Sequence, residues 1–414
     1  MRKSYLLPLL LILALTSCNE GKDNPEPEAK AVSFNFRLDP LPEATKDFEL
    51  ILSQKDGKVL LDTMLTGRTS HALTIKSNDT KFDVTTVYQN PNTTAYSMRT
   101  YIQVNPDGWH IDEQLTNWEE DKSRPTVVNY TNVNPFKGPS VQFGAMHAEL
   151  YRSQFVGQND DMLRVEYNRQ FPTDLTYLLL PEQGKYIFAE VTSPVTYVDF
   201  SNAATAVKHK FINSTPDGVY GSYLVGLYGY PETGNEKNRV TLYVSANNPP
   251  EYDLQYPPTG IKEFLLIVSY LKYQNNKGYR HDYYHIGPTI PTELPFIPEA
   301  DFSVAKSQFN DFQIQFAEDK PSTYSTMWSS WENVRADWVI SVSPEETAFN
   351  PQGLLEKLRP TLLKDKDLSG FRIYRTMTRT AKGYTHQTMN DYLSNPEAYL
   401  RMEPKQFRNV YTYF

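Results

Sequence analysis

The chain has one cysteine in 414 residues, which excludes an internal disulfide and a cysteine-based zinc site. Basic residues are also few: 41 Lys and Arg stand against 49 Asp and Glu, a net charge of −8. This charge argues against nucleic acid as the main partner. The sequence contains no Walker loop, no Gly-x-Gly-x-x-Gly and no Gly-x-Ser-x-Gly elbow. We therefore expect a protein that is not an enzyme, with no catalytic residues, no cofactor and no nucleic-acid partner.

Aromatic residues are abundant instead. They make up 13% of the chain, with 29 Tyr and 21 Phe. Aromatic and β-branched side chains favour half-buried strands. Short segments that alternate apolar and polar residues, such as Phe34 to Leu38, recur between turn signals. The composition therefore predicts a mainly β protein.

The N-terminus has the features of a secretory signal. Arg2-Lys3 precedes the apolar run Leu6–Leu15, which is too short to span a bilayer. Leu15-Thr16-Ser17 before Cys18 resembles the lipobox of bacterial lipoproteins. The resemblance implies cleavage before Cys18 and acylation of that residue, and several acyl chains give a stable anchor. The predicted location is the outer membrane, on its periplasmic face or at the cell surface, with the membrane bound through the lipid.

Turn signals and proline-rich stretches divide the chain into segments. The predicted fold class is mainly β, with tandem immunoglobulin-like β-sandwich domains and a C-terminal α+β portion. We expect a signal peptide at 1–17, a flexible tether at 18–30, an immunoglobulin-like sandwich at 31–104, a linker at 105–139 with one short strand at Thr126–Tyr130, a second sandwich at 140–286, a proline-rich hinge at 287–298 and the α+β domain at 299–414.

Two helices are expected in the last domain. Asn350-Pro351 combines an N-cap residue with a first-turn proline, and it opens a helical run that Pro360 interrupts. Asn395-Pro396-Glu397 has the same pattern and starts the other helix.

Two residue patterns resemble metal-binding motifs, but their spacing argues against a metal site. His281 and His285 would share one face of a helix, but the sequence around them predicts a strand, on which residues four apart are about 13 Å apart. Asp365-Lys366-Asp367 opens like a calcium loop, but Thr376 stands where the bidentate acid is required. We expect no metal site.

Four aromatic residues form the candidate binding site. Tyr324, Trp328, Trp331 and Trp338 occur among Ser, Thr, Glu and Asn. Aromatic faces beside small polar groups suit sugar rings, so these residues are predicted to form an aromatic platform for a glycan. The alternative is that they fill a core. Trp328 and Trp331 can share one ligand only on a helix or loop, because residues three apart face opposite sides of a strand.

The predicted architecture consists of a lipid anchor, a tether, an immunoglobulin-like spacer and an aromatic module. It resembles the multi-domain cell-envelope binding lipoproteins that accompany nutrient uptake in Bacteroidota. The resemblance implies a carbohydrate-binding accessory protein with a glycan partner. The alternative is a structural, adhesion or assembly subunit that meets another envelope protein through a sheet edge.

Overall fold

The computed structural model is mainly β. It describes residues 29–38, 47–65, 70–90, 94–111, 124–133, 141–146, 154–159, 161–169, 171–213, 219–233, 239–247, 249–274, 276–294, 302–317, 320–332, 334–394 and 405–414. The predicted mainly β class with a small helical part is confirmed. No helix among these residues is long and apolar enough to cross a bilayer. Cys18 and residues 18–28 of the predicted tether lie outside the described residues, and Lys30 at the end of that tether already belongs to the first strand.

The N-terminal unit is a two-layer sandwich. Its strands are β1 (Lys30–Leu38), β2 (Phe48–Ser53), β3 (Val59–Leu65), β4 (Ser70–Ser77), β5 (Phe82–Gln89), β6 (Tyr96–Val104) and β7 (His110–Ile111). One layer has the strand order β4-β1-β7, and the other runs β3-β2-β5-β6. Phe34 and Phe36 are buried while Ser33 and Asn35 are exposed, so the alternation seen in the sequence separates core from surface.

The second sandwich follows. Its elements are β8 (Arg124–Thr131), β9 (Gln142–Ala145), β10 (Gln154–Asn159), β11 (Met162–Arg169), β12 (Asp174–Leu180), β13 (Lys185–Val191), β14 (Val195–Asp199), the 3₁₀ turn η3 (Phe200–Asn202) and β15 (Ala204–Thr205). The layers β10-β11-β8-β14 and β15-β13-β12-β9 enclose a core of their own.

Six strands between Val207 and Gly287 form the middle part of the molecule. They are β16 (Val207–Ile212), β17 (Val219–Tyr230), β18 (Val240–Ser245), β19 (Glu251–Tyr256), β20 (Glu263–Gln274) and β21 (Lys277–Gly287). Tyrosine and phenylalanine fill the core between these strands and the β12–β13 hairpin. Tyr177 and Tyr186 pack in one cluster with Phe211, Tyr252 and Tyr270. Much of the aromatic content therefore serves packing.

The C-terminal module contains strands and two helices. Its elements are β22 (Phe302–Gln308), β23 (Asp311–Phe316), β24 (Thr323–Ser330), β25 (Ala336–Val342), β26 (Ala348–Phe349), α2 (Pro351–Leu358), the 3₁₀ turn η4 (Thr361–Leu363), β27 (Arg372–Ala381), α3 (His386–Ser394) and β28 (Gln406–Tyr413). The predicted start of α2 is confirmed: Asn350 caps it by accepting from the Gly353 N–H at 2.8 Å, and Pro351 opens it. Asn395 and its predicted helix lie outside the described residues.

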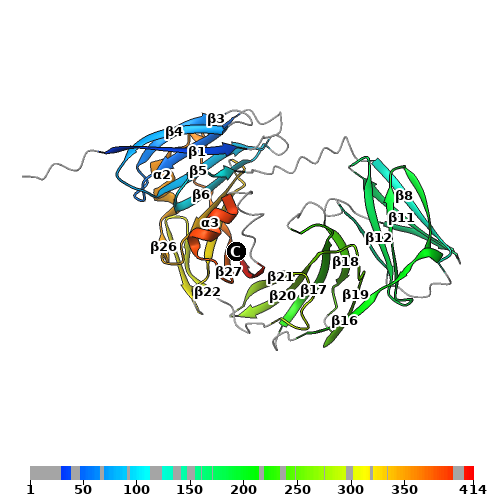
Figure 1. Cartoon of the computed structure of the whole chain (residues 1–414). Helices are drawn as coiled ribbons and strands as arrows, with labels where there is room; N and C mark the ends of the chain where they lie inside the picture. The colour runs from blue at the N-terminus through cyan, green and yellow to red at the C-terminus, as the bar shows by residue number, and fades with distance from the viewer. Residues whose placement is uncertain are drawn as a thin grey trace, which may run out of the picture.

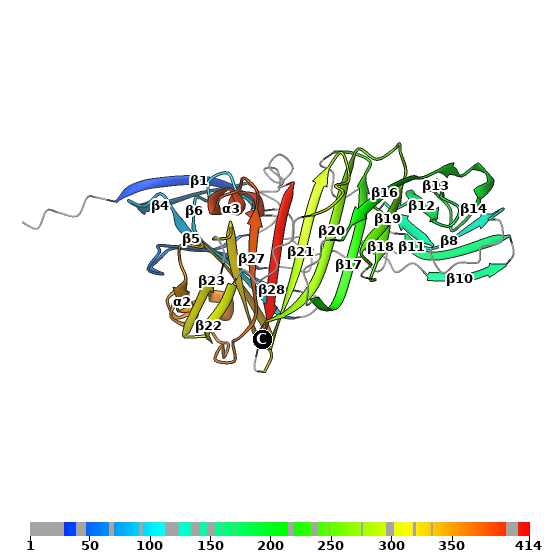
Figure 2. The same cartoon turned by 90° about the horizontal axis from the view of Figure 1, so that it is seen from below.

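One sheet of twelve strands crosses most of these units, in the order β18-β17-β20-β21-β28-β27-β24-β25-β6-β5-β2-β3. Figure 2 shows the succession through β27, β28, β21, β20 and β17. β6 and β25 pair in parallel, so the N-terminal sandwich lies directly beside the C-terminal module, whereas the second sandwich lies at the far end (Figure 1). The chain thus leaves the N-terminal sandwich and returns to it some 230 residues later.

Two segments expected to be connections take part in the folded units. Within 105–139, β7 pairs with β1, and β8 is a central strand of the second sandwich because it pairs with β11 and β14. Within 287–298, Thr292 O accepts from the Ile212 N–H at 2.7 Å, and Ile290 and Leu294 are buried. Residues 112–123 and 134–139 lie outside the described residues, as do 295–298.

Candidate functional site

Three residues of the predicted aromatic platform lie in the core. Tyr324, Trp328 and Trp338 each have 0% of their surface exposed. Trp328 on β24 pairs with Trp338 on β25, and their indole N–H groups donate at 2.9 Å to Thr326 and Thr100 respectively. A sugar cannot reach these rings. The platform prediction is therefore wrong for these three residues, and the alternative that they fill a core holds.

Strand geometry explains the difference from Trp331. Tyr324 and Trp328 are four residues apart on β24, so both face the same core. Trp331 follows the end of the strand and is 59% exposed. The Arg335 guanidinium lies 4.9 Å from the centre of its ring. Of the four predicted residues, only Trp331 can meet a ligand from solvent.

A cavity of about 930 Å³ lies in the same C-terminal module, and we call it the C-terminal cavity. The β22–β23 turn, α2, η4 and the segment that leads into β27 enclose it. Its volume is at the upper end of the range of small-molecule binding sites, about 300–1,000 Å³. Four exposed, uncharged polar side chains line it: Gln308, Asn310, Gln352 and Ser369.

The floor of the cavity is apolar. Phe309 stacks on Phe371 with ring centres 5.3 Å apart and an interplanar angle of 24°. Trp328 packs against the back of Phe309, also at 5.3 Å between ring centres. Leu355 and Leu363 are buried at its side. The buried tryptophan therefore supports the floor of the cavity without lining it.

The rim of the cavity is positively charged. Arg359, Lys364, Lys366 and Arg372 line it and are exposed, and we call them the cationic rim. Among the described residues that line the cavity, Glu356 has the one side-chain carboxylate. Four cationic side chains and one anionic side chain leave three net positive side-chain charges, in a chain whose net charge is −8. The side chains of the cavity thus differ in sign of charge from the chain as a whole.

Arg359 adopts an unusual backbone conformation at this rim. It is the C-cap of α2, with φ 45° and ψ 58°. This left-handed region is where helices commonly end on glycine, because a side chain is disfavoured there. Its Nε donates to Glu356 O at 3.0 Å, which fixes the guanidinium beside the cavity.

The N-terminal sandwich holds one wall of the cavity in place. The Glu49 carboxylate on β2 accepts the N–H groups of Thr361 and Leu362, the latter at 2.9 Å, where η4 begins. Asp62 Oδ2 accepts from the Thr361 hydroxyl at 3.1 Å, and Lys357 of α2 donates to Asp56 O. Burial raises the pKa of Glu49 to about 7, and the neighbouring Asp62 adds to this rise.

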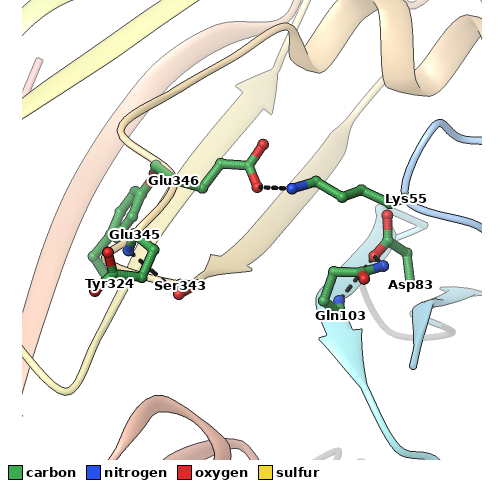
Figure 3. Close-up of polar contacts among 7 residues, drawn as sticks. All are labelled: Lys55, Asp83, Gln103, Tyr324, Ser343, Glu345 and Glu346. Carbon is green, nitrogen blue, oxygen red and sulfur yellow. Dashed lines mark hydrogen bonds and ion pairs between the residues drawn. The ribbon is translucent and has the colours of Figure 1, made fainter. Parts of the chain in front are cut away.

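A further polar contact joins the same two units (Figure 3). Lys55 of the β2–β3 turn reaches the Glu346 carboxylate at 3.2 Å, as the figure shows. The contacts made by Glu49, Lys55 and Asp62 make the N-terminal sandwich a support for the C-terminal module. Within the N-terminal sandwich, Asp83 accepts from the backbone and the side-chain amide of Gln103, at 2.8 and 3.0 Å. Burial raises the pKa of Asp83 to about 6.

His281 and His285 lie on the strand β21, as predicted. His281 is fully buried and stacks on Tyr270 at 4.8 Å between ring centres. Burial lowers its pKa to about 3, so the ring is neutral. Within the residues that the structure describes, no group of three or more His, Cys, Asp or Glu could hold a metal ion.

Sequence reasoning missed the C-terminal cavity. A signal was present: between Glu356 and Arg375, cations outnumber carboxylates although the whole chain is acidic. The contribution of Phe309 and of Glu49 had no local signal, because both meet this segment only through the fold. No family model matches the chain, and no curated protein sequence matches it significantly.

Proposed function

We propose that the protein is a lipid-anchored cell-envelope binding protein that holds a carbohydrate ligand in the C-terminal cavity. The cavity is the observation that carries this proposal. It combines an aromatic floor at Phe309 with exposed amide side chains at its edge, Gln308, Asn310 and Gln352. Sugar recognition uses both features, because the C–H face of a sugar packs on apolar surface while its hydroxyls exchange hydrogen bonds.

A direct binding measurement tests the proposal. Wild-type protein should be retained on a subset of a glycan array, and Asn310→Ala/Gln352→Ala should weaken that retention at least about threefold, as expected for lost hydrogen bonds. Both side chains are exposed, so the variant should keep its fold, as circular dichroism can verify. Asn168→Ala/Asn202→Ala, which removes two exposed amide side chains from the second sandwich, is the matched control. Equal retention of all three proteins would contradict the assignment to this cavity.

The anchor is the other half of the proposal. It rests on the lipobox-like tripeptide before Cys18 and on the polar, acidic tether that follows. Cells given a clickable fatty acid should label the wild-type protein, and Cys18→Ala should lose the label because no thiol remains to be acylated. Undiminished label on the variant would contradict the lipoprotein assignment.

An assembly subunit is the second candidate, and an edge strand favours it. β14 lies at the end of its sheet as described and carries two exposed apolar side chains, Val195 at 49% and Tyr197 at 72%. Exposed apolar edge strands are sites for pairing with another chain. A photo-crosslinker at position 197 should capture a specific envelope protein if this candidate is correct. A crosslinker at the exposed position Lys208 is the control.

A further inference from the structure

The cations of the cavity rim differ from many others in the described chain because four of them line one cavity and none of the four is in an ion pair. Elsewhere many cations are paired with carboxylates, namely Lys55 with Glu346, Arg164 with Glu166, Lys210 with Glu251, Arg280 with Asp282, Lys306 with Asp311, Lys320 with Glu345 and Lys405 with Glu263. Among the residues that the structure describes, no ion pair involves Arg359, Lys364, Lys366 or Arg372. Four cations without an ion pair, against the one side-chain carboxylate of Glu356, leave the cavity with a net positive charge.

Three of the carboxylates near the rim are bound to other groups, and Asp365, which lies between Lys364 and Lys366 in the sequence, is exposed. Glu356 Oε1 accepts from the Gln352 amide at 2.8 Å. Asp367 Oδ1 accepts from the Ser369 N–H at 3.0 Å, and Glu49 accepts two N–H groups of η4. Hydrogen bonds within the protein thus hold these three acids, while the cations keep their donors for a ligand.

The arginines of the rim are oriented by the backbone. Arg359 Nε donates to Glu356 O, and one terminal nitrogen of Arg372 donates to Ser369 O and Phe371 O at 3.0 and 2.9 Å. Each guanidinium keeps further N–H donors in its plane, the arrangement that binds carboxylate and sulfate oxygens in pairs.

The positive charge continues beyond the cavity. Lys366 Nζ lies 5.8 Å from the ring centre of Tyr96, and the Tyr96 N–H donates to Arg335 O at 2.8 Å. Arg335 in turn lies over the exposed Trp331 ring. Lys366, Tyr96, Arg335 and Trp331 are thus successive neighbours from the cavity to Trp331, and we call this series the strip. A strip of this kind suits a polymer better than a single small anion.

We propose that the C-terminal cavity and the strip to Trp331 bind an acidic polysaccharide, whose carboxylate or sulfate groups meet the cationic rim while its sugar faces pack on Phe309 and Trp331. This inference rests on the proposed function and names its ligand class. Nucleic acid is the less favoured polyanion, because the secretory signal before Cys18 predicts a location outside the cytoplasm.

Titration calorimetry with defined polymers tests the inference. The probes are polygalacturonate for carboxylates, dextran sulfate for sulfates, neutral dextran and a single-stranded oligonucleotide. The wild-type protein should bind one or both acidic polysaccharides at least about tenfold more tightly than dextran and the oligonucleotide, and raising the salt concentration should weaken this binding.

Two variants locate the binding. Lys364→Ala/Lys366→Ala should bind the acidic polysaccharide about tenfold more weakly, because two charges of the rim are removed, and the fold should be kept because both side chains are exposed. Arg359→Gly should also weaken binding, while glycine suits the left-handed backbone at that position and so preserves the fold. Lys185→Ala/Lys208→Ala removes the same charge from exposed sites in the middle of the chain and should change affinity less than twofold.

The outcomes separate this inference from the proposed function. Binding of neutral dextran that the rim variants leave unchanged would overturn the inference and keep the carbohydrate function. Absence of binding to every polysaccharide would overturn both. Equal affinity for the oligonucleotide and the acidic polysaccharides, or an equal loss in the Lys185/Lys208 control, would show a general attraction to polyanions and overturn the inference.

Discussion

The two sandwiches are joined to the rest of the molecule in different ways. At the first junction, β6 and β25 pair in parallel from Tyr96 with Ala336 to Tyr101 with Ser341, and Trp338 donates to Thr100 across it. At the second junction, β9 lies beside β18 without a shared backbone ladder among the described residues. The Gln142 amide donates to and accepts from the Val244 backbone there, at 3.5 and 3.2 Å.

The type of contact at each junction determines how precisely it positions the neighbouring sandwich. A backbone ladder is directional and fixes register, so the first junction places β2 and Glu49 where they hold η4 at the cavity. The second junction depends more on apolar packing, because Tyr177 of the second sandwich lies in one core with Val225 of β17 and Leu266 of β20. Apolar packing is less directional. The N-terminal sandwich therefore belongs to the candidate binding site, and the second sandwich stands apart from it.

Removing the tryptophan at the first junction should have the largest effect. Trp338→Ala deletes a fully buried indole and its hydrogen bond to Thr100, and we expect the free energy of unfolding to fall by about 3–5 kcal/mol. Chemical denaturation measures it. Trp331→Ala, at an exposed ring, should change it by less than about 0.5 kcal/mol. Similar losses for the two variants would contradict the burial that separates these tryptophans.

Removing the carboxylate that holds η4 should have the next largest effect. Glu49→Ala leaves the N–H groups of Thr361 and Leu362 without their acceptor, at an expected cost of about 2–3 kcal/mol. Glu49→Gln keeps one acceptor oxygen and should cost less. Ligand affinity should fall in Glu49→Ala as well, because η4 lines the cavity through Leu363. Unchanged stability in both variants would show that the junction does not depend on this contact.

A methyl group at the second junction should have a smaller effect. A Cβ on Gly144 would lie 2.4 Å from Thr241 O and 3.0 Å from Thr241 N, so β9 must move away from β18. We expect Gly144→Ala to cost about 1–2 kcal/mol and to leave ligand affinity unchanged. At Gly278 an added Cβ meets only the side-chain ends of Leu271 and Tyr273, so Gly278→Ala is the control. Loss of ligand affinity in Gly144→Ala would mean that the second junction also shapes the site.

The pH dependence of stability should be the smallest effect. Burial raises the pKa values of Glu49 and Asp83 to about 7 and about 6, so the folded state binds these protons more tightly than the unfolded chain. The protonated forms of these two groups therefore contribute stability to the folded state at low pH, and this contribution is lost as the pH rises from about 4 to 7. Stability should therefore fall by about 1 kcal/mol between pH 5 and pH 8, after allowance for solvent screening.

A double variant that lacks both carboxyl groups is the control for this pH effect. Glu49→Gln/Asp83→Asn should flatten the dependence, since neither amide titrates. Thermal unfolding at a series of pH values measures both proteins. A slope of the opposite sign in the wild type, or the same slope in the variant, would contradict the assignment to these carboxylates.

The sequence alone predicted features that depend on neighbouring residues, but not those that depend on the tertiary fold. The cap at Asn350-Pro351 predicted α2 because capping depends on adjacent residues alone. Trp328 and Trp331 could not be separated, because their exposure depends on where β24 ends. The cavity could not be predicted from the sequence, because it brings Phe309 together with Phe371. It is also held in place by Glu49, which lies more than 300 residues from η4 in the chain.

Hydrogen–deuterium exchange with and without an oligogalacturonate tests the central claim most directly, namely that the C-terminal cavity binds the ligand and that the first junction frames it. We expect slower exchange at residues 359–372 in the bound protein and no change at β14 or elsewhere in the second sandwich. Protection confined to the second sandwich, or unchanged exchange at 359–372 under saturating ligand, would contradict the account.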